Sequence, residues 1–175
     1  QWQGSLRATY NKYLHPDVLD YTNPQMWEDM QNGKIANLFQ FETQVGAVCI
    51  KRTRPTSVAE LGAANAVMRL MGEEGEERPL DRYVRFRDNI NEWYKEMDEA
   101  GLTPEEQQVL KEELLSKYGN SVEQEDMMRL VQRPEIANFT LGEANLLRKA
   151  VAKKDAKKIE KMKKRFFEAV DEGGE

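Results

Sequence analysis

The sequence predicts an all-α fold, an irregular domain built from several helices. Helix start and stop signals recur along the chain, apolar residues repeat at helical spacing, and no segment alternates as a strand does. The segment NLFQFE, residues 37–42, comes closest to a strand but is too short to build a sheet. At 175 residues the chain can bury a core, and we expect one domain over residues 1–175.

Short polar motifs mark four helix starts. Asn23 before Pro24 can cap a short helix that runs to Met30. Three further starts place a glutamate three positions after a hydroxyl residue, the spacing of a capping box: Ser57 with Glu60, Thr103 with Glu106, and Thr140 with Glu143. Stops are expected at Gly101, Gly119 and Pro134.

The middle of the chain predicts one long helix over residues 79–100. Its inward side is apolar except for one arginine and comprises Leu80, Tyr83, Val84, Arg87, Ile90, Tyr94 and Met97. The segment GEEGEERP, residues 72–79, precedes this helix, and we expect it to be an internal loop between two helical halves.

Charge is divided unevenly along a chain whose formal net charge is -5. Residues 73–113 hold fourteen acids and six bases, whereas residues 148–165 hold ten bases and two acids. A run of like charge is usually a solvated face, but a strongly basic stretch in an acidic chain favours a polyanionic partner.

Two amphipathic helices are expected in this basic stretch. In the first, over residues 140–152, Ala144, Leu147 and Val151 share one arc, and Arg148, Lys149 and Lys153 lie on another. Asp155 can cap the second helix, whose buried stripe is Ile159, Met162, Phe166 and Val170. The second helix then presents an outward basic face of Lys157, Lys158, Lys161, Lys164 and Arg165.

Phosphate groups are the natural ligands of such faces. An arginine offers a bidentate fork and a lysine a mobile point charge, and several such contacts give binding that depends on salt. The alternative is that the charge serves solubility alone. Phe166 and Phe167 could stack on bases, but the spacing of Phe166 favours a core position.

Patterns for catalysis, metal binding and membrane insertion are weak. His15 and Cys49 are each the only residue of their type, which gives little support to a histidine triad or a zinc site. Cys49 indicates a small core residue in a reducing compartment. Neither an apolar run of membrane length nor a signal region occurs. We therefore expect a soluble cytoplasmic chain with no catalytic residue, no metal and no membrane partner.

The basic stretch resembles a segment of a known family. TLGEANLLRKAVAKKD, residues 140–155, is similar to the fingers domain of bacterial replicative DNA polymerase III alpha subunits, the C-family DNA polymerases, where Thr-Leu-Gly leads to Leu-Arg-Arg-Ala and Gly-Lys-Lys-Lys. The positions that match in register are Thr140, Leu141, Gly142, Ala144, Leu147, Arg148, Ala150, Lys153 and Lys154.

Three upstream blocks extend this resemblance in the order of the family. KYGNSVEQEDMM resembles its Tyr-Gly and Gln-Glu segment, NLFQFETQVG its Phe-Gln-Leu-Glu-Ser segment, and RPTSVAELGAANAVMR its Asp-Leu stretch ending in arginine. The four blocks span residues 38–170. The departures indicate a divergent member from a bacterium or a phage: RLMG at residues 69–72, Lys149 for the second arginine, Ala152 for glycine and Asp155 for the third lysine.

The resemblance implies the fingers portion of a DNA-directed DNA polymerase, which binds the triphosphate of an incoming dNTP and the primer-template DNA. Nucleotidyl transfer would be completed by a palm outside this chain, so the chain alone should be inactive. Mg²⁺ is expected in the parent polymerase and no cofactor in this chain. The remaining partners are the palm and thumb of the same polymerase.

The resemblance also assigns candidate site residues. Phosphate contacts are implied for Arg148, for Lys149 more weakly, and for Lys153 and Lys154. Three other matched positions face substrate or only hold helices together: Gln40, Arg69 and Gln124. The basic face of the second helix would meet DNA.

Two other functions stay open from the residues alone. The first is a stand-alone helical DNA-binding or regulatory protein, which would grip phosphates without any polymerase. The second is an interaction module whose acidic middle helices bind a basic partner protein.

Overall fold

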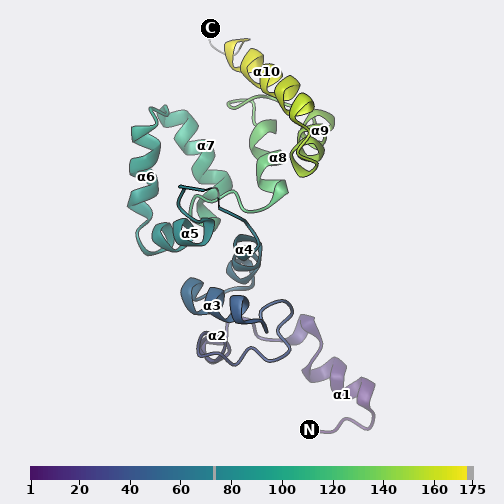
Figure 1. Cartoon of the computed structure of the whole chain (residues 1–175). Helices are drawn as coiled ribbons and strands as arrows, with labels where there is room; N and C mark the ends of the chain where they lie inside the picture. The colour runs from purple at the N-terminus through teal and green to yellow at the C-terminus, as the bar shows by residue number, and fades with distance from the viewer. Residues whose placement is uncertain (73, 173–175) are drawn as a thin grey trace. The chain divides into compact units, whose positions relative to one another are not determined.

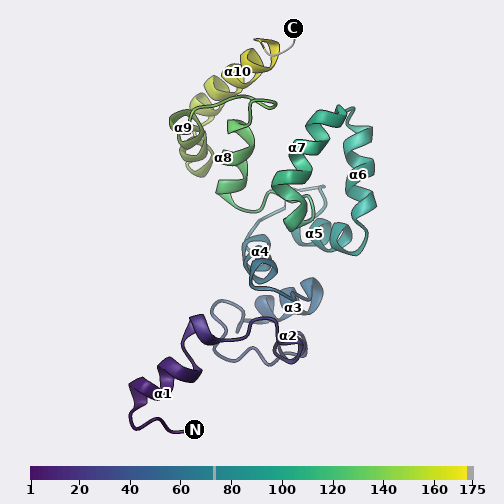
Figure 2. The same cartoon turned by 180° about the vertical axis from the view of Figure 1, so that it is seen from behind.

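The computed structural model describes the backbone of residues 1–72 and 74–172, and side chains as far as residue 168. Over these residues it contains ten α-helices, two short 3-10 helices and no β-strand, which confirms the all-α prediction (Figures 1 and 2). The chain divides into two compact units, unit 1 over residues 1–62 and unit 2 over residues 63–175. The single domain expected from the sequence stays a prediction.

Unit 1 begins with capped helices. It holds α1 (Leu6–Tyr13), the 3-10 helix η1 (Pro16–Val18), α2 (Pro24–Gln31), α3 (Gln44–Thr53) and the first residues of α4 (Val58–Met68). The side chain of Asn23 accepts a hydrogen bond from the Gln25 N–H at 3.0 Å, and Pro24 is the first residue of α2. The start predicted at Asn23 is therefore confirmed, because this cap satisfies a backbone donor that a helix leaves open.

The core of unit 1 forms around Phe41, Cys49 and Ile50. Phe41 is buried while Phe39 is 76% exposed, and neither belongs to a strand. A Cβ at Gly46 would overlap the backbone of Phe41, so glycine at this position lets α3 approach the preceding loop. Cys49 is fully buried, as predicted, and burial raises the pKa of its thiol to about 11.

Unit 2 starts with the rest of α4 and continues through α5 (Pro79–Asp88), α6 (Ile90–Glu99), α7 (Pro104–Leu114) and the 3-10 helix η2 (Leu115–Lys117). Residues 72 and 74–78, in the segment expected to be a loop, contain no helix. Thr103 and Glu106 form the capping box predicted for α7, with the Thr103 N–H donating to Glu106 at 2.7 Å. At α4, Glu60 N–H donates to Ser57 at 3.1 Å, but the Glu60 carboxylate reaches Thr56.

The long helix predicted over residues 79–100 is wrong in one respect, because the chain breaks at Asn89. This residue has φ -146° and ψ 89°, outside the helical region, and it separates α5 from α6. The two helices then pack against each other and bury Phe86 and Trp93, which the single-helix stripe did not contain. The apolar residues on both sides of Asn89 happen to keep helical spacing, so the sequence pattern did not show that the helix ends there.

Gly119 is required by a close approach of the chain to a ring. It has φ +74°, and a Cβ at this position would overlap the indole of Trp93. The preceding residue, Tyr118, also has positive φ at 52° and packs its ring edge-on to Tyr83. This pair ends η2 at the stop predicted for Gly119 and brings the chain back against the α5–α7 core.

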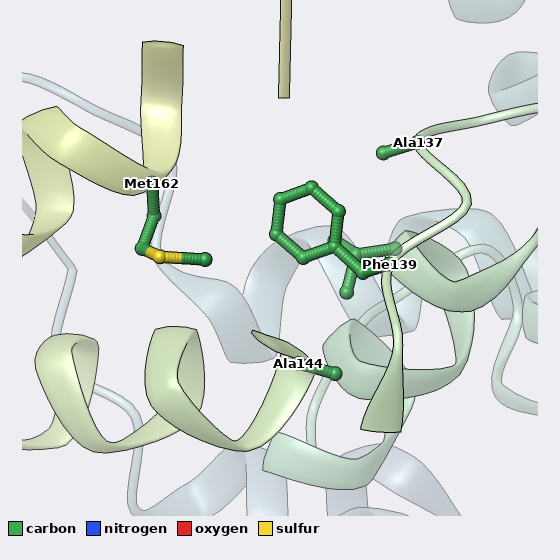
Figure 3. Packing of buried hydrophobic residues seen from close by; sticks show 5 residues of the cluster. Ala137, Phe139, Ala144 and Met162 are labelled. Atoms are coloured by element: carbon green, nitrogen blue, oxygen red, sulfur yellow. The ribbon is translucent and has the colours of Figure 1, made fainter. Parts of the chain in front are cut away.

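Three helices complete unit 2: α8 (Gln124–Gln132), α9 (Leu141–Ala152) and α10 (Ala156–Glu172). Their shared core contains Val131, Ala137, Phe139, Ala144 and Met162. Figure 3 shows the ring of Phe139 at the centre of this cluster, with Ala144 of α9 and Met162 of α10 on two sides of it. Ile159 and Phe166 are partly buried, as the predicted stripe of α10 requires; the side chain of Val170 lies outside the described residues.

Asp126 connects α8 to the α7 side of unit 2. Its carboxylate is 0% exposed and accepts hydrogen bonds from the N–H groups of Val122 and Glu123 at 3.1 and 3.0 Å. It also accepts from Lys117 Nζ at 2.5 Å and from Arg129 Nη2 at 2.7 Å. Burial opposes the charge on Lys117, but its bonds to Asp126 and Glu123 raise its pKa above the usual value. The carboxylate is thus fully paired, as a buried charge must be.

Replacing Asp126 with alanine should lower the free energy of unfolding by about 3 kcal/mol, because the poorly exposed Lys117 ammonium keeps only its bond to Glu123 and two buried backbone N–H groups lose their acceptor. Urea denaturation of this chain measures the effect. Glu125→Ala, at the exposed neighbouring position, should change stability by no more than about 0.5 kcal/mol. Equal losses for the two variants would contradict the role given to Asp126.

Candidate phosphate-binding surface

The basic residues predicted to bind phosphate gather where α9 ends and α10 begins. We call this surface the basic corner and define it by Arg148, Lys149, Lys153 and Lys154 of the α9 side and by Lys157, Lys158, Lys161 and Lys164 of α10. All seven lysines are exposed, and Arg148 is half-buried. The two helices lie against each other, as Figures 1 and 2 show from opposite directions.

The start of α9 is fixed by the capping box predicted there. Glu143 N–H donates to Thr140 Oγ1 at 3.2 Å, and the Thr140 N–H donates to Glu143 Oε2 at 2.8 Å. Hydrogen bonds from the backbone and hydroxyl of Thr140, and then the Arg165 guanidinium, lower the pKa of the Glu143 carboxyl. Ala144 and Ala150 are buried in the helix that follows.

Arg165 does not lie on the outward face predicted for it. Its Nε donates to Glu143 Oε1 at 3.1 Å, and its guanidinium lies 5.5 Å from the centre of the Phe139 ring. The side chain is half-buried and joins α10 to the start of α9. Its charge is therefore balanced inside the unit, which sequence spacing could not show because Glu143 is 22 positions away.

The prediction for Val151 is also wrong. The sequence placed it on the packing arc of α9, but its side chain is 45% exposed, while Ala150 is buried. Val151 lies in the last turn, where the core is closed by the α10 residues that follow the corner. Leu147 does pack against the core, as predicted.

Each residue between α9 and α10 takes part in ending the first helix or starting the second. Lys154 N–H donates to the Val151 carbonyl at 3.0 Å and Asp155 N–H to the Ala150 carbonyl at 2.9 Å, the two bonds of a Schellman motif. Lys154 has φ +51°, in the left-handed region that usually holds glycine. Asp155 then accepts from the Lys158 N–H at 3.2 Å, which confirms the predicted cap of α10.

The same aspartate also binds one lysine of the corner. Lys158 Nζ lies 2.9 Å from Asp155 Oδ2. The Lys158 ammonium, and then its backbone N–H, lower the pKa of the Asp155 carboxyl. The other lysines of the corner form no ion pair within the described part of the chain.

Arg148 is held by neutral groups. Its Nε and Nη2 donate to Asn145 Oδ1 at 3.1 and 2.9 Å, and its Nη1 donates to Gln124 Oε1 at 3.0 Å. Among the described residues no carboxylate pairs with it. The structure thus joins Gln124 and Arg148, from two separate blocks of the resemblance, and adds Asn145, which the sequence analysis missed. The spacing of three residues between Asn145 and Arg148 on a helix could have indicated that contact.

The other two candidate residues lie elsewhere. Arg69 is exposed just after α4 and forms no side-chain hydrogen bond within the described residues. Gln40 belongs to unit 1, is half-buried and has φ +67°. Their roles stay predictions.

No group of three or more His, Cys, Asp or Glu side chains is arranged to hold a metal ion in the described part of the chain. None of the helices described here is both long and apolar enough to cross a membrane.

An all-helical unit that ends in a capped basic corner agrees with the fingers resemblance. The sequence profile described as "Bacterial DNA polymerase III alpha subunit finger domain" matches residues 2–174. The chain therefore belongs to this family, which confirms the resemblance and extends it over residues 2–37.

The similar proteins are polymerases. The chain is 42% identical to "Probable DNA polymerase YorL" of Bacillus subtilis and, equally, to "DNA-directed DNA polymerase" of Bacillus phage SPbeta, over 99% of this chain and 13% of each relative. It is 30% identical to "DNA polymerase III subunit alpha" of Treponema pallidum over 98% of this chain and 14% of that protein. The chain thus spans a small part of the relatives it matches.

Replacing Lys154 with glycine should raise the free energy of unfolding by about 0.5 kcal/mol, because glycine adopts the left-handed conformation without strain but loses more entropy on folding. Lys153→Gly is the matched control: φ is -91° there, so this variant should lose about 0.5–1 kcal/mol. Thermal unfolding of both variants checks the sign. Losses of similar size at the two positions would contradict the strain assigned to Lys154.

Proposed function

We propose that this chain is the fingers portion of a DNA-directed DNA polymerase whose basic corner holds the triphosphate of an incoming dNTP and phosphates of the primer-template DNA. The palm and thumb of the same polymerase would lie in the polypeptide beyond this chain. A cytoplasmic location, where a bacterial or phage genome is replicated, is part of the proposal. The single observation that carries it is the charged Arg148 side chain, which neutral groups hold in place and which pairs with no carboxylate among the described residues.

Pairing elsewhere in unit 2 makes this observation informative. Arg85 bonds to Glu77, Glu92 and Glu96 at 2.7 to 2.9 Å. Arg133 likewise faces three glutamates at 2.9 to 3.5 Å. Carboxylates neutralise these two arginines, whereas Arg148, without such a partner among the described residues, keeps its charge for a ligand. A guanidinium matches two phosphate oxygens at once, which suits it to a triphosphate.

The lysines of the corner supply the remaining positive charge. Lys149 lies in the last turn of α9, and Lys153 and Lys154 directly follow it, where cations are favoured by the partial negative charge of the helix end. Lys157, Lys161 and Lys164 continue the exposed charge along α10. Ammonium groups on long stems can follow a flexible or sliding backbone of phosphates, so this part suits DNA, whose sequence the polymerase must ignore.

The chemistry of nucleotide addition explains what such charges do. The 3′ hydroxyl of the primer releases its proton to water, and its oxygen bonds to the α-phosphorus. The bond from that phosphorus to the bridging oxygen of the β-phosphate breaks, so pyrophosphate leaves with increased negative charge. Fixed cations beside the β- and γ-phosphates stabilise that charge as it develops. The described residues contain no group of three or more His, Cys, Asp or Glu side chains arranged to hold a metal ion, and we assign no metal-dependent step to this chain. Without the palm, the chain should not polymerise.

The alternatives are less well supported. The alignments to proteins named as DNA polymerases cover 98–99% of this chain, which a stand-alone DNA-binding protein would leave unexplained. An acidic interaction module would need acidic side chains that are not already paired with arginines of the same chain. Five of the fourteen acids in residues 73–113 are instead paired with Arg85, Arg129 or Arg133 inside unit 2.

The basic corner predicts DNA binding that weakens steeply with salt. Titration of this chain with duplex DNA at rising salt should show that Lys153→Ala with Lys154→Ala lowers the slope of log K against log salt by about 2, because two phosphate contacts are lost. Lys12→Ala with Lys51→Ala, two exposed lysines of unit 1, removes the same charge as a control. If the salt slope fell equally for both double variants, DNA binding would depend on net charge alone and would not be located at the basic corner.

Arg148→Ala in the full polymerase that carries this chain should lower kcat/KM for dNTP by about 100-fold, because the bidentate contact to the triphosphate is removed. The melting temperature of the 175-residue chain should change by no more than about 2 °C, since the lost hydrogen bonds are accessible to water. Single-nucleotide incorporation measures the first quantity. Normal incorporation with a large drop in melting temperature would show that Arg148 is structural.

A further inference from the structure

We infer that Gln124 and Asn145 are positioning residues, whose amide oxygens hold the Arg148 guanidinium in the orientation that receives the triphosphate. The inference rests on the proposed function of Arg148 and adds two residues to it. The sequence analysis left undecided whether Gln124 contacts substrate or only holds helices together, and it assigned no role to Asn145.

The geometry fixes the guanidinium from two sides. Asn145 Oδ1 accepts from both Nε and Nη2, at 3.1 and 2.9 Å, and Gln124 Oε1 accepts from Nη1 at 3.0 Å. Arginine has five N–H donors, so these three bonds leave one on each terminal nitrogen. Within the described residues nothing occupies those two donors. They form a two-point donor of the kind that binds phosphate oxygens.

The two acceptors come from different helices. Asn145 lies one turn before Arg148 on α9, and Gln124 is the first residue of α8. The start of α8 is held by the buried carboxylate of Asp126, and α8 packs along α9. Gln124 therefore projects from a rigid base, which lets a flexible arginine keep one orientation before substrate arrives.

The choice of amides preserves the charge. A glutamate or aspartate at these distances would bind the guanidinium more strongly but would cancel the charge that the triphosphate needs. Unit 2 uses carboxylates for Arg85, Arg129 and Arg133 and amides for Arg148. An amide orients without neutralising, and this separates a positioning contact from an ordinary ion pair.

A double-mutant cycle in the full polymerase tests the assignment. Gln124→Ala and Asn145→Ala should each lower kcat/KM for dNTP by about 10-fold, the cost of a lost hydrogen bond to a charged group. In an Arg148→Ala background neither change should lower it further, because their effect passes through the arginine. Asn145→Asp, which keeps the acceptor but adds a negative charge, should lower it more than Asn145→Ala. Gln132→Ala, an amide loss at the far end of α8, is the control and should leave it unchanged.

The 175-residue chain gives an independent readout by NMR. The Arg148 Nε–H signal should exchange slowly with water, shift on addition of inorganic tripolyphosphate, and disappear in Asn145→Ala at an unchanged melting temperature. Additive losses in the double variants, or an Nε–H that exchanges equally fast with and without Asn145, would overturn the positioning role. An Arg148→Ala polymerase with normal kcat/KM would instead overturn the proposed function, so the two failures are distinguishable.

Discussion

The buried carboxylate of Asp126 is the interaction on which the second unit depends. It gathers the end of η2, the loop before α8 and the first turn of α8 around one fully paired negative charge. A group of this kind is costly in isolation and tolerates few other arrangements of its partners, so it specifies one geometry more than it adds stability. Because α8 packs on α9, that geometry also decides where Arg148 and Gln124 meet.

The division of charge along the chain has a structural explanation. In the acid-rich middle, glutamates surround Arg85 and Arg133, so a large formal charge becomes a set of internal ion pairs. Near the carboxyl end two of the acids are used for capping: Glu143 closes the start of α9, and Asp155 closes the start of α10. The lysines of the basic corner are left exposed, and an acidic chain can therefore present a cationic surface to a polyanion.

Sequence reasoning succeeded where a structure is decided locally. The caps at Asn23, Thr103 and Thr140 and the cap at Asp155 follow from side chains three residues or fewer from their partners, and the basic arc of α9 follows from helical spacing. It failed where distant segments decide. The break at Asn89, the ion pair of Arg165 with Glu143 and the burial of Asp126 each depend on packing between helices. An aspartate inside a polar helix start gives no sign that four donors converge on it.

The corner between α9 and α10 has an evolutionary consequence. Asp155 is at once the last residue of the stop and the cap of the next helix, so the two helices are joined without a linker. One residue added or removed there would turn α10 by about 100° about its own axis and rotate Met162 out of the core. The packing of Met162 therefore fixes the length of this junction. Alignments of relatives should show no gaps there.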